Sequence, residues 1–292
     1  MNQTGPRVFG DELPRITVVM PSYNQVQYLE EAIQSILEQD YANLEFMILD
    51  GGSTDGSREI IERYSDRLAY WHSRPDKGQT DALIQGFERA TGHLMGWVNS
   101  DDVLLPRALH SIAQAYVSNP EGGLIGGNYV LTDADSRIVR CKRHPANPAW
   151  FARLGLFLVN QPGSFFAPQS YRASGGLNIE LHYVMDNDLY VRLLLGGTRF
   201  IHIDRFLAGF RVHPLAKTAS ANRSRAIAEY KYAQRKYWPE DATHANKQSF
   251  GRGVYIIHQV VTGNYLRMAI ETCRFHGQHW RNLYAEQEES SR

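Results

Sequence analysis

The feature that most constrains the fold is an apolar strand that leads directly into two neighbouring carboxylates, within residues 92–102. Residues 94–98 are apolar and follow a Thr-Gly turn signal, a pattern that indicates a short buried strand. In parallel α/β sheets, ligands bind at the carboxyl ends of the strands. At such an end, Asp101 and Asp102 can hold a divalent cation that carries a phosphate. The alternative is that one of them caps the helix expected from Pro106.

Strand and helix patterns alternate through residues 16–117. The first strand is expected at residues 16–20 and should stop at Pro21, because proline cannot continue a central hydrogen-bond ladder. Asn24 is then expected to cap the first helix. The other strands expected in this half are residues 44–49, 68–72 and 94–98. Regular alternation of this kind predicts right-handed βαβ units and a parallel, doubly wound sheet.

The pattern changes after Pro120. Short apolar runs with turn residues between them predict a hairpin, so the parallel sheet is expected to become mixed. The expected strands are residues 122–128, 129–132, 138–141, 199–203 and 208–211, and the expected C-terminal helices are residues 224–237 and 253–275. The predicted fold class is therefore α/β, with a mostly parallel, mixed central sheet, flanking helices and a helical C-terminal extension.

The charge balance and the cysteine content exclude several classes of protein. The 31 Lys and Arg residues equal the 31 Asp and Glu residues, so no basic field indicates nucleic-acid binding. Cys141 and Cys273 have no metal or redox spacing, and a disulfide framework is not expected, in agreement with a reducing compartment. Residues 1–13 lack the apolar core of a signal peptide, and no apolar run is long enough for a transmembrane helix. We therefore expect a cytoplasmic protein.

Polar residues follow several of the predicted parallel strands, where such a fold builds a nucleotide pocket. Tyr23 could stack on a base, Asp50 could accept hydrogen bonds from a base or a ribose, and a metal at Asp101 could bridge two phosphates. The Gly-rich loop at residues 51–57 matches neither a P-loop nor a dinucleotide fingerprint. Each of these residues, taken alone, also has a structural explanation: packing for Tyr23, a helix cap for Asp50 and an exposed loop position for Gln79. The residues expected at this edge are Pro21, Tyr23, Asp50, Gln79, Asn99, Ser100 and Asp101.

Several motifs together resemble glycosyltransferase family 2. The nucleotide-sugar half of that family is matched by residues 18–24, 48–57 and 99–102. The acceptor half of its bacterial members is matched by residues 161–166, 175–178, 185–189 and 210–214. The resemblance covers about residues 15–220, in the order and spacing of the family. It implies a GT-A-type, Rossmann-like fold, a nucleotide-sugar donor with UDP favoured, a divalent metal and inversion at the anomeric carbon.

The same resemblance predicts the domain organisation. Residues 15–222 would form the GT-A-type catalytic domain, with a nucleotide-sugar half at residues 15–118 and an acceptor half at residues 119–222. Residues 223–292 would form a C-terminal helical extension. For this extension the alternatives are helices that pack on the catalytic domain, and a peripheral membrane or homodimer contact that brings the enzyme to a lipid-linked acceptor.

The metal motif of the family is Asp-x-Asp, often with a further Asp. Here Asn99 stands in place of the first acid, Asp101 matches the metal-binding acid, and Asp102 matches the additional one. The neutral Asn99 removes one charge, which would weaken metal binding. His213 matches a position that supplies a metal ligand in some members, and its nitrogen would favour Mn²⁺ over Mg²⁺. The alternative for His213 is a loop position without a metal.

The general base of the family is the Asp of a Glu-Asp pair ahead of an amphipathic helix. Here Met185 replaces the Glu, and Asp186 matches the base. Asp188 is the second choice, although a helix N-cap is the favoured interpretation for it. His182 is expected to pack or to line the acceptor site. Lys217 lies in a polar loop that is expected to fold over bound donor and exclude water.

The resemblance predicts an inverting, metal-dependent glycosyltransferase. Its acceptor would be a hydroxyl group of a glycan or lipid-linked glycan, in bacterial surface polysaccharide synthesis at the inner face of the cell membrane. A sugar-phosphate nucleotidyltransferase is one alternative, but residues 21–27 lack the Arg or Lys of its basic N-terminal loop. A non-catalytic nucleotide- or glycan-binding module is the other, because Asn99 and Met185 replace acids that are usual in the family.

Overall fold

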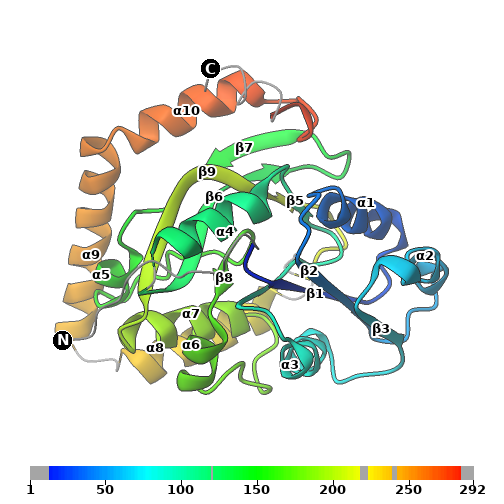
Figure 1. The fold of residues 1–292 in the computed structure, drawn as a ribbon. Coiled ribbons are helices and arrows are strands. Elements are labelled where there is room, and N and C mark those ends of the chain that lie inside the picture. The colour runs from blue at the N-terminus through cyan, green and yellow to red at the C-terminus, as the bar shows by residue number, and fades with distance from the viewer. Residues whose placement is uncertain (1–12, 120, 218–222, 239–241, 284–292) are drawn as a thin grey trace.

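A nine-stranded sheet forms the centre of the computed structural model, which describes residues 13–119, 121–217, 223–238 and 242–283. The strands are β1 (Ile16–Ser22), β2 (Leu44–Asp50), β3 (Tyr70–Ser73), β4 (Leu94–Trp97), β5 (Val103–Leu104), β6 (Gly122–Thr132), β7 (Ile138–Lys142), β8 (Phe165–Phe166) and β9 (Arg199–Arg211). Their order is β3-β2-β1-β4-β8-β6-β9-β5, with β7 paired to β6 (Figure 1). Strands β1 to β4 are parallel, and β8 is antiparallel to both of its neighbours. The sheet is mixed, as the sequence predicted.

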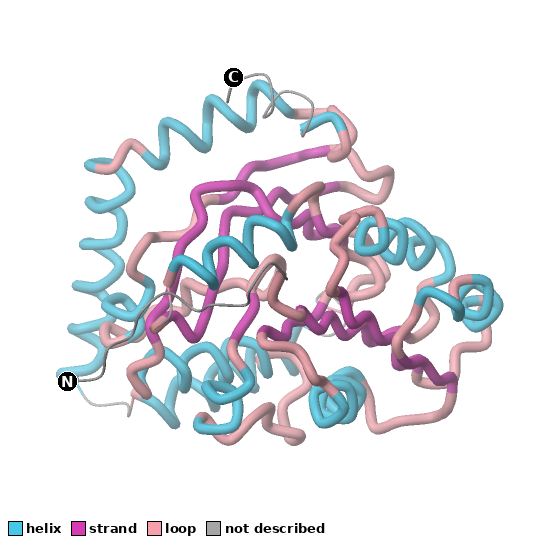
Figure 2. Tube along the Cα trace, in the orientation of Figure 1, coloured by secondary structure: helices cyan, strands magenta, loops and turns pink. Residues whose placement is uncertain are grey.

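Helices cover both faces of this sheet (Figure 2). They are α1 (Val26–Leu37), α2 (Ser57–Arg63), a 3₁₀ helix (Ser65–Arg67), α3 (Gln79–Arg89), α4 (Ala108–Ser118), α5 (Pro148–Ala152), α6 (Pro168–Ala173), α7 (Met185–Leu195), α8 (Arg223–Tyr237), α9 (Ala242–Val261) and α10 (Asn264–Phe275). One buried cluster joins α1, α2 and α4 to the sheet, and a second joins α3 and α7 to it. Apolar residues at helical spacing, such as Leu29, Ile33 and Ile36 in α1, create these buried faces.

Strand β1 continues through Pro21 to Ser22, so the prediction that it stops at the proline is wrong. It pairs with β2 along its whole length, but with β4 only as far as Val19. The carbonyl of Val19 accepts a hydrogen bond from Val98 on the β4 side, and Pro21, two residues later, faces the same side. Because the pairing with β4 has ended there, the missing N–H of the proline breaks no ladder.

Helix α1 is not capped by Asn24, contrary to the prediction. Asn24 has a positive φ of 50°, and its side-chain oxygen accepts a hydrogen bond from the N–H of Thr54 at 2.9 Å. The N–H of Val26, the first residue of α1, donates to the carboxylate of Asp55 at 2.9 Å. The Gly-rich loop before α2 therefore caps α1, and this contact holds the loop beside the end of β1.

The hairpin predicted after α4 is confirmed, since β6 pairs antiparallel with β7. Strands β6 and β9 are each continuous where the sequence predicted two strands. They pair parallel with each other, and the register of this pairing shifts at several points, for example between Gly127 and Asn128. Strand β5, which the sequence did not predict, pairs antiparallel with β9. These pairings bring the end of β9 close to the segment that follows β4.

The last helix predicted from the sequence, residues 253–275, is divided between two helices. Gly263 separates α9 from α10 with a positive φ of 68°, a conformation that glycine adopts at little cost. Helix α10 runs beside β7, where the N–H of Cys141 donates to Thr272 Oγ1 at 3.0 Å. Within the described part of the chain, none of the helices has the length and apolar character that crossing a membrane requires.

Candidate active site

A cavity of about 1250 Å³ lies at the carboxyl ends of β1 and β4. Nine of the residues predicted from the sequence line it: Pro21, Tyr23, Gln79, Asn99, Ser100, Asp101, His182, Asp186 and Lys217. Tyr129 and Leu131 of β6 also line it, so both parts of the mixed sheet contribute to its wall. The side chain of Tyr23 is 63% exposed, which leaves its ring available to a ligand.

Asp50 is fully buried at the end of β2 and organises the loop that follows it. Its carboxylate accepts hydrogen bonds from the N–H groups of Gly52 and Ser53 at 3.1 and 2.9 Å. The hydroxyl groups of Ser53 and Ser73 also donate to it. Gly51 and Gly52 line the cavity, so Asp50 shapes the cavity wall from behind. Direct contact of Asp50 with a nucleotide stays a prediction.

A chain of hydrogen bonds crosses the cavity from Lys217 to the end of β4. Lys217 Nζ donates to Gln79 Oε1 at 2.7 Å, and Gln79 Nε2 donates to Asn99 Oδ1 at 2.7 Å. Asn99 Nδ2 in turn donates to Asp102 Oδ2 at 2.9 Å and to Gln161 Oε1 at 3.2 Å. A carboxylate at residue 99 could not donate to Asp102. The amide that replaces the usual acid is therefore suited to this network.

Asp102 lies beneath the cavity wall. Only 2% of the residue is exposed, and its carboxylate accepts a hydrogen bond from the N–H of Arg211 at 2.9 Å. Burial, together with the nearby charge of Asp101, raises the pKa of Asp102 well above its usual value. Through this hydrogen bond, Asp102 joins the segment after β4 to the end of β9.

Asp101 and His213 are brought together although 112 positions separate them in the chain. His213 Nε2 lies 3.1 Å from Asp101 Oδ2, and the imidazole packs against the ring of Tyr28 at 4.5 Å between centroids. No group of three His, Cys, Asp or Glu side chains suited to a metal occurs within the described ranges. One carboxylate oxygen and one imidazole nitrogen fit Mn²⁺ or Mg²⁺ if the oxygens of a bound diphosphate complete the coordination.

Arg211, which the sequence analysis did not single out, anchors this pair. Its guanidinium is buried, with Nε donating to the carbonyl of Asp101 at 2.8 Å and Nη2 to Glu31 Oε2 at 2.6 Å. Nη1 donates to Ser136 Oγ at 2.8 Å. Arg211 therefore fixes the backbone of Asp101 and the strand that leads to His213. An arginine between the apolar Phe210 and Val212 near the end of a strand is the signal that could have identified it.

Asp186 occupies the first turn of α7 and faces the cavity. Its Oδ1 accepts hydrogen bonds from the N–H of Asn187 at 2.8 Å and from Asn187 Nδ2 at 3.2 Å. Burial raises the pKa of Asp186, and these hydrogen bonds and the charge of Lys217 partly oppose that effect. Met185, which replaces the usual Glu, packs in the buried cluster beneath α7. Asp186 therefore presents a carboxylate of raised basicity to the cavity, a group that can accept a proton.

Lys217 supplies the cavity with a titratable cation. Burial lowers its pKa to about 8, although the carboxylates of Glu229 and Asp186 favour the charged form. Its ammonium group also lies 5.5 Å from the centre of the Tyr183 ring. The predicted covering loop runs from residue 211 to residue 221, and its residues 218–221 lie outside the described residues.

Glu229 of α8 holds the segment that leads into α7, and the sequence analysis missed it. One oxygen of its carboxylate accepts hydrogen bonds from the N–H groups of His182, Tyr183 and Val184, at 3.0, 2.6 and 3.3 Å. These bonds satisfy donors at the beginning of the helix that carries Asp186. Glu229 comes from the C-terminal helices, outside every motif, so no local pattern indicated this contact.

Asp188 does not reach the cavity. Its side chain is fully buried, and its carboxylate accepts hydrogen bonds from Arg192 Nη2 at 2.6 Å and from Tyr237 Oη at 2.5 Å. It is also the fourth residue of α7, while Val184 holds the N-cap position. Neither expectation for Asp188, second base or N-cap, agrees with these contacts. Asp188 instead joins α7 to α8.

Residues 17–173 match the family model described as "Glycosyl transferase family 2". The Bacillus subtilis protein named "Putative teichuronic acid biosynthesis glycosyltransferase TuaG" is 34% identical over 92 residues, which cover 30% of this chain and 36% of that protein. The fold is similar to S. aureus TarS 1–349 in complex with UDP-GlcNAc, with a TM-score of 0.57, 14% identity, and coverage of 83% of this chain and 80% of that one.

The fold is also similar to the mannosyltransferase PcManGT from Pyrobaculum calidifontis in complex with GDP-Man and Mn²⁺. There the TM-score is 0.55 at 18% identity, with coverage of 97% of this chain and 87% of that one. The chain spans 19% to 40% of the length of the first curated relatives that it matches.

Proposed function

The chain belongs to glycosyl transferase family 2, and from that premise we propose that it is an inverting, metal-dependent glycosyltransferase. It transfers a sugar from a nucleotide donor, with UDP favoured, to a hydroxyl group of a glycan or lipid-linked glycan. Its mixed α/β sheet is the predicted GT-A-type fold. In this proposal residues 15–222 form the catalytic domain, and the described helices α8 to α10 belong to a C-terminal extension.

The observation that carries this proposal is the presence of Asp186 and Asp101 in the wall of one cavity. Asp101 contacts His213, and the pair offers ligands for a cation at the phosphate side. Asp186 comes from the other part of the fold and offers a proton acceptor. A donor sugar held between the two would have its anomeric carbon near the base and its diphosphate near the cation.

The donor and the pathway are supported by the named relatives. TarS has been solved with UDP-GlcNAc, and PcManGT with GDP-Man and Mn²⁺. The relative from Bacillus subtilis is named for teichuronic acid biosynthesis. We therefore favour a nucleotide-sugar donor and an acceptor in bacterial surface polysaccharide synthesis.

In the proposed reaction, the acceptor hydroxyl oxygen attacks the anomeric carbon from the face opposite the nucleotide. Asp186 takes the hydroxyl proton as the new carbon–oxygen bond forms, and the bond to the diphosphate breaks. Protonated Lys217 adds positive charge to the cavity in which the diphosphate departs. Asp101 and His213 would hold a divalent cation, which when bound neutralises charge on the leaving diphosphate.

A test of this function measures nucleotide release from a panel of UDP- and GDP-sugars, with Mn²⁺, Mg²⁺ or EDTA. We expect metal-dependent release from one donor, and a loss of about a hundredfold in Asp101→Asn and His213→Ala. Arg58→Ala, which removes an exposed ion pair with Glu62 and leaves both ligands and Arg211 in place, is the control. Release that EDTA does not affect would contradict the metal site. Nucleotide binding without turnover, even with glycan acceptors added, would favour the binding-module alternative.

A further inference from the structure

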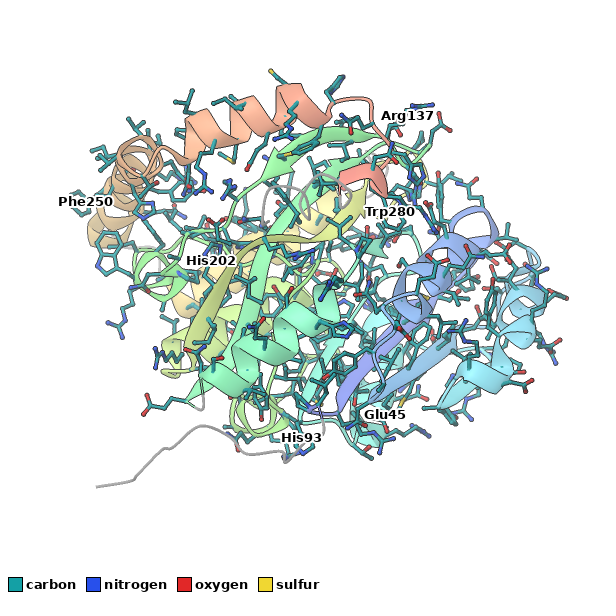
Figure 3. The ribbon with its side chains drawn as sticks, turned by 45° about the horizontal axis from the view of Figure 1, so that its top comes forward. Glu45, His93, Arg137, His202, Phe250 and Trp280 are labelled. Atoms are coloured by element: carbon teal, nitrogen blue, oxygen red, sulfur yellow. The ribbon has the colours of Figure 1, made fainter. Side chains whose placement is uncertain are left out.

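The outer side of α9 and α10 carries an unusual amount of exposed apolar surface. Seven large apolar side chains on these two helices are more than half exposed, which exceeds the number on the rest of the described chain. We call them the α9–α10 face: Phe250, Ile256, Ile257, Val260, Val261, Leu266 and Ile270. Figure 1 shows the two helices along the outer edge of the molecule, and Figure 3 shows Phe250 on the outer side of α9. Apolar surface gathered in this way marks an interaction site.

The opposite sides of these helices already pack on the protein. In α9, Gln259 is fully buried, and the ring of Tyr255 packs against Phe151 at 5.4 Å between centroids. In α10, Phe275 is buried, and Glu271 forms an ion pair with Arg143. The α9–α10 face is therefore a second apolar side of an anchored pair of helices.

The charges beside this face are almost all positive. Arg252, Arg267 and Arg274 are exposed, and Arg267 also contacts Asp204 at 3.2 Å. The only acid between residues 248 and 283 is Glu271, which is engaged with Arg143. Arg267 and Arg274 are seven residues apart, so they lie on the same side of α10, next to Leu266 and Ile270.

We propose that the α9–α10 face binds the surface of an anionic lipid membrane. Apolar side chains at helical spacing with arginines beside them are typical of helices that lie in the membrane interface, where the arginines reach acidic headgroups. A second copy is a poorer occupant, because a two-fold contact would place the cationic faces of both copies against each other. This inference does not depend on the proposed reaction, since α9 and α10 contribute no residue to the cavity wall.

The test is co-sedimentation of the full chain with vesicles of phosphatidylcholine alone or mixed with phosphatidylglycerol. We expect binding to the mixed vesicles and at least tenfold weaker binding to phosphatidylcholine. The double variant I257N/L266N removes apolar surface without changing charge and is expected to weaken binding at least tenfold. R252Q is expected to weaken binding to the anionic vesicles only. Leu195→Asn changes an exposed leucine of α7 and is the matched control.

Several outcomes would overturn the proposal. Equal sedimentation of the wild type and I257N/L266N would show that the face does not contact lipid. An absence of wild-type binding to the mixed vesicles would have the same meaning. Dimers in light scattering that I257N/L266N dissociates, without vesicle binding, would assign the face to a second copy. Circular dichroism melting confirms that the variants are folded, and nucleotide release, measured separately, reports on the proposed reaction.

Discussion

Asp186 and Asp188 lie two residues apart in one helix, yet the fold gives their carboxylates different surroundings. Asp186 lines the cavity, where its Oδ1 accepts hydrogen bonds from Asn187. Asp188 is fully buried and is bound by Arg192 and Tyr237. At the residue scale, a role therefore depends on what lies around a side chain and not on the residue type alone.

Asp186→Asn is expected to lower kcat by about 10²–10⁴-fold, because an amide cannot take the acceptor proton. Its melting temperature should stay close to that of the wild type. Asp188→Asn is the comparison. It should retain kcat, because Asp186 is unchanged. It should lower the free energy of unfolding by about 3 kcal/mol, because it breaks a buried ion pair with Arg192. Sugar-transfer assays and urea unfolding measure both effects. A folded, inactive Asp188→Asn beside an active Asp186→Asn would reverse the assignment.

The pH profile of kcat/KM should reflect Lys217. Its pKa, lowered by burial to about 8, means that it is cationic below about pH 8 and neutral above it. We therefore expect kcat/KM to fall as the pH rises through about 8. In Lys217→Arg this decrease should move to higher pH, because a guanidinium stays charged. In Lys217→Met activity should be low throughout, and the decrease near pH 8 should disappear. An unchanged profile in both variants would rule out Lys217 as its cause.

At the scale of elements, α8 determines where the beginning of α7 lies. Glu229 accepts three backbone hydrogen bonds from residues 182–184, and Tyr237 binds Asp188 one turn into α7. Two contacts from one helix thus fix the start of another. Asp186 lies between these contacts, so its position depends on α8 although it does not touch Glu229 in any described hydrogen bond.

Glu229→Ala is expected to lower the free energy of unfolding by about 2 kcal/mol and kcat by about tenfold, because it leaves the donors before α7 without their partner. Glu229→Gln retains an acceptor oxygen and should recover most of the stability. The lost charge should, however, move the decrease in kcat/KM to a pH below 8, since Glu229 favours protonated Lys217. Glu121→Ala, in an exposed ion pair with Arg199, should change little. A pH profile of Glu229→Gln that matches the wild type would contradict this coupling.

At the scale of the whole molecule, the end of the described chain packs against its beginning. Trp280, which Figure 3 labels, is buried, and its Nε1 donates to Glu31 Oε1 of α1 at 2.7 Å. Glu31 also accepts a hydrogen bond from Arg211, which holds the backbone of Asp101. The segment after α10 is therefore connected to the candidate metal site through two side chains.

Trp280→Ala is expected to lower the free energy of unfolding by about 3–5 kcal/mol, because it leaves a large cavity and removes a partner of Glu31. Phe250→Ala truncates an exposed aromatic ring on α9 and should change the free energy of unfolding by less than about 0.5 kcal/mol. Urea unfolding of both variants measures the difference. Similar stability losses in the two variants would contradict the burial of Trp280.

The elements that the sequence predicted well are those with local signals. Apolar runs and turn residues indicated β2 and the β6–β7 hairpin. The spacing of apolar side chains within a short segment is sufficient to predict elements of this kind. Errors arose where a neighbouring strand decided the outcome. Pro21 stays in β1 because β4 has already ended, and β9 is continuous because β6 supports it.

For the candidate site, the sequence by itself determined the family, and the motifs of that family predicted Asp101, Asp186 and His213 as site residues. Only the tertiary structure placed Asp101 beside His213. It also gave Asp186 a place in the cavity wall, whereas Asp188 lies buried in an ion pair with Arg192. Arg211 and Glu229 have no role that a local pattern reveals, because their partners lie far away in the chain. Sequence patterns report which side chains are available, whereas distance, burial and pKa depend on contacts that form only when the chain has folded.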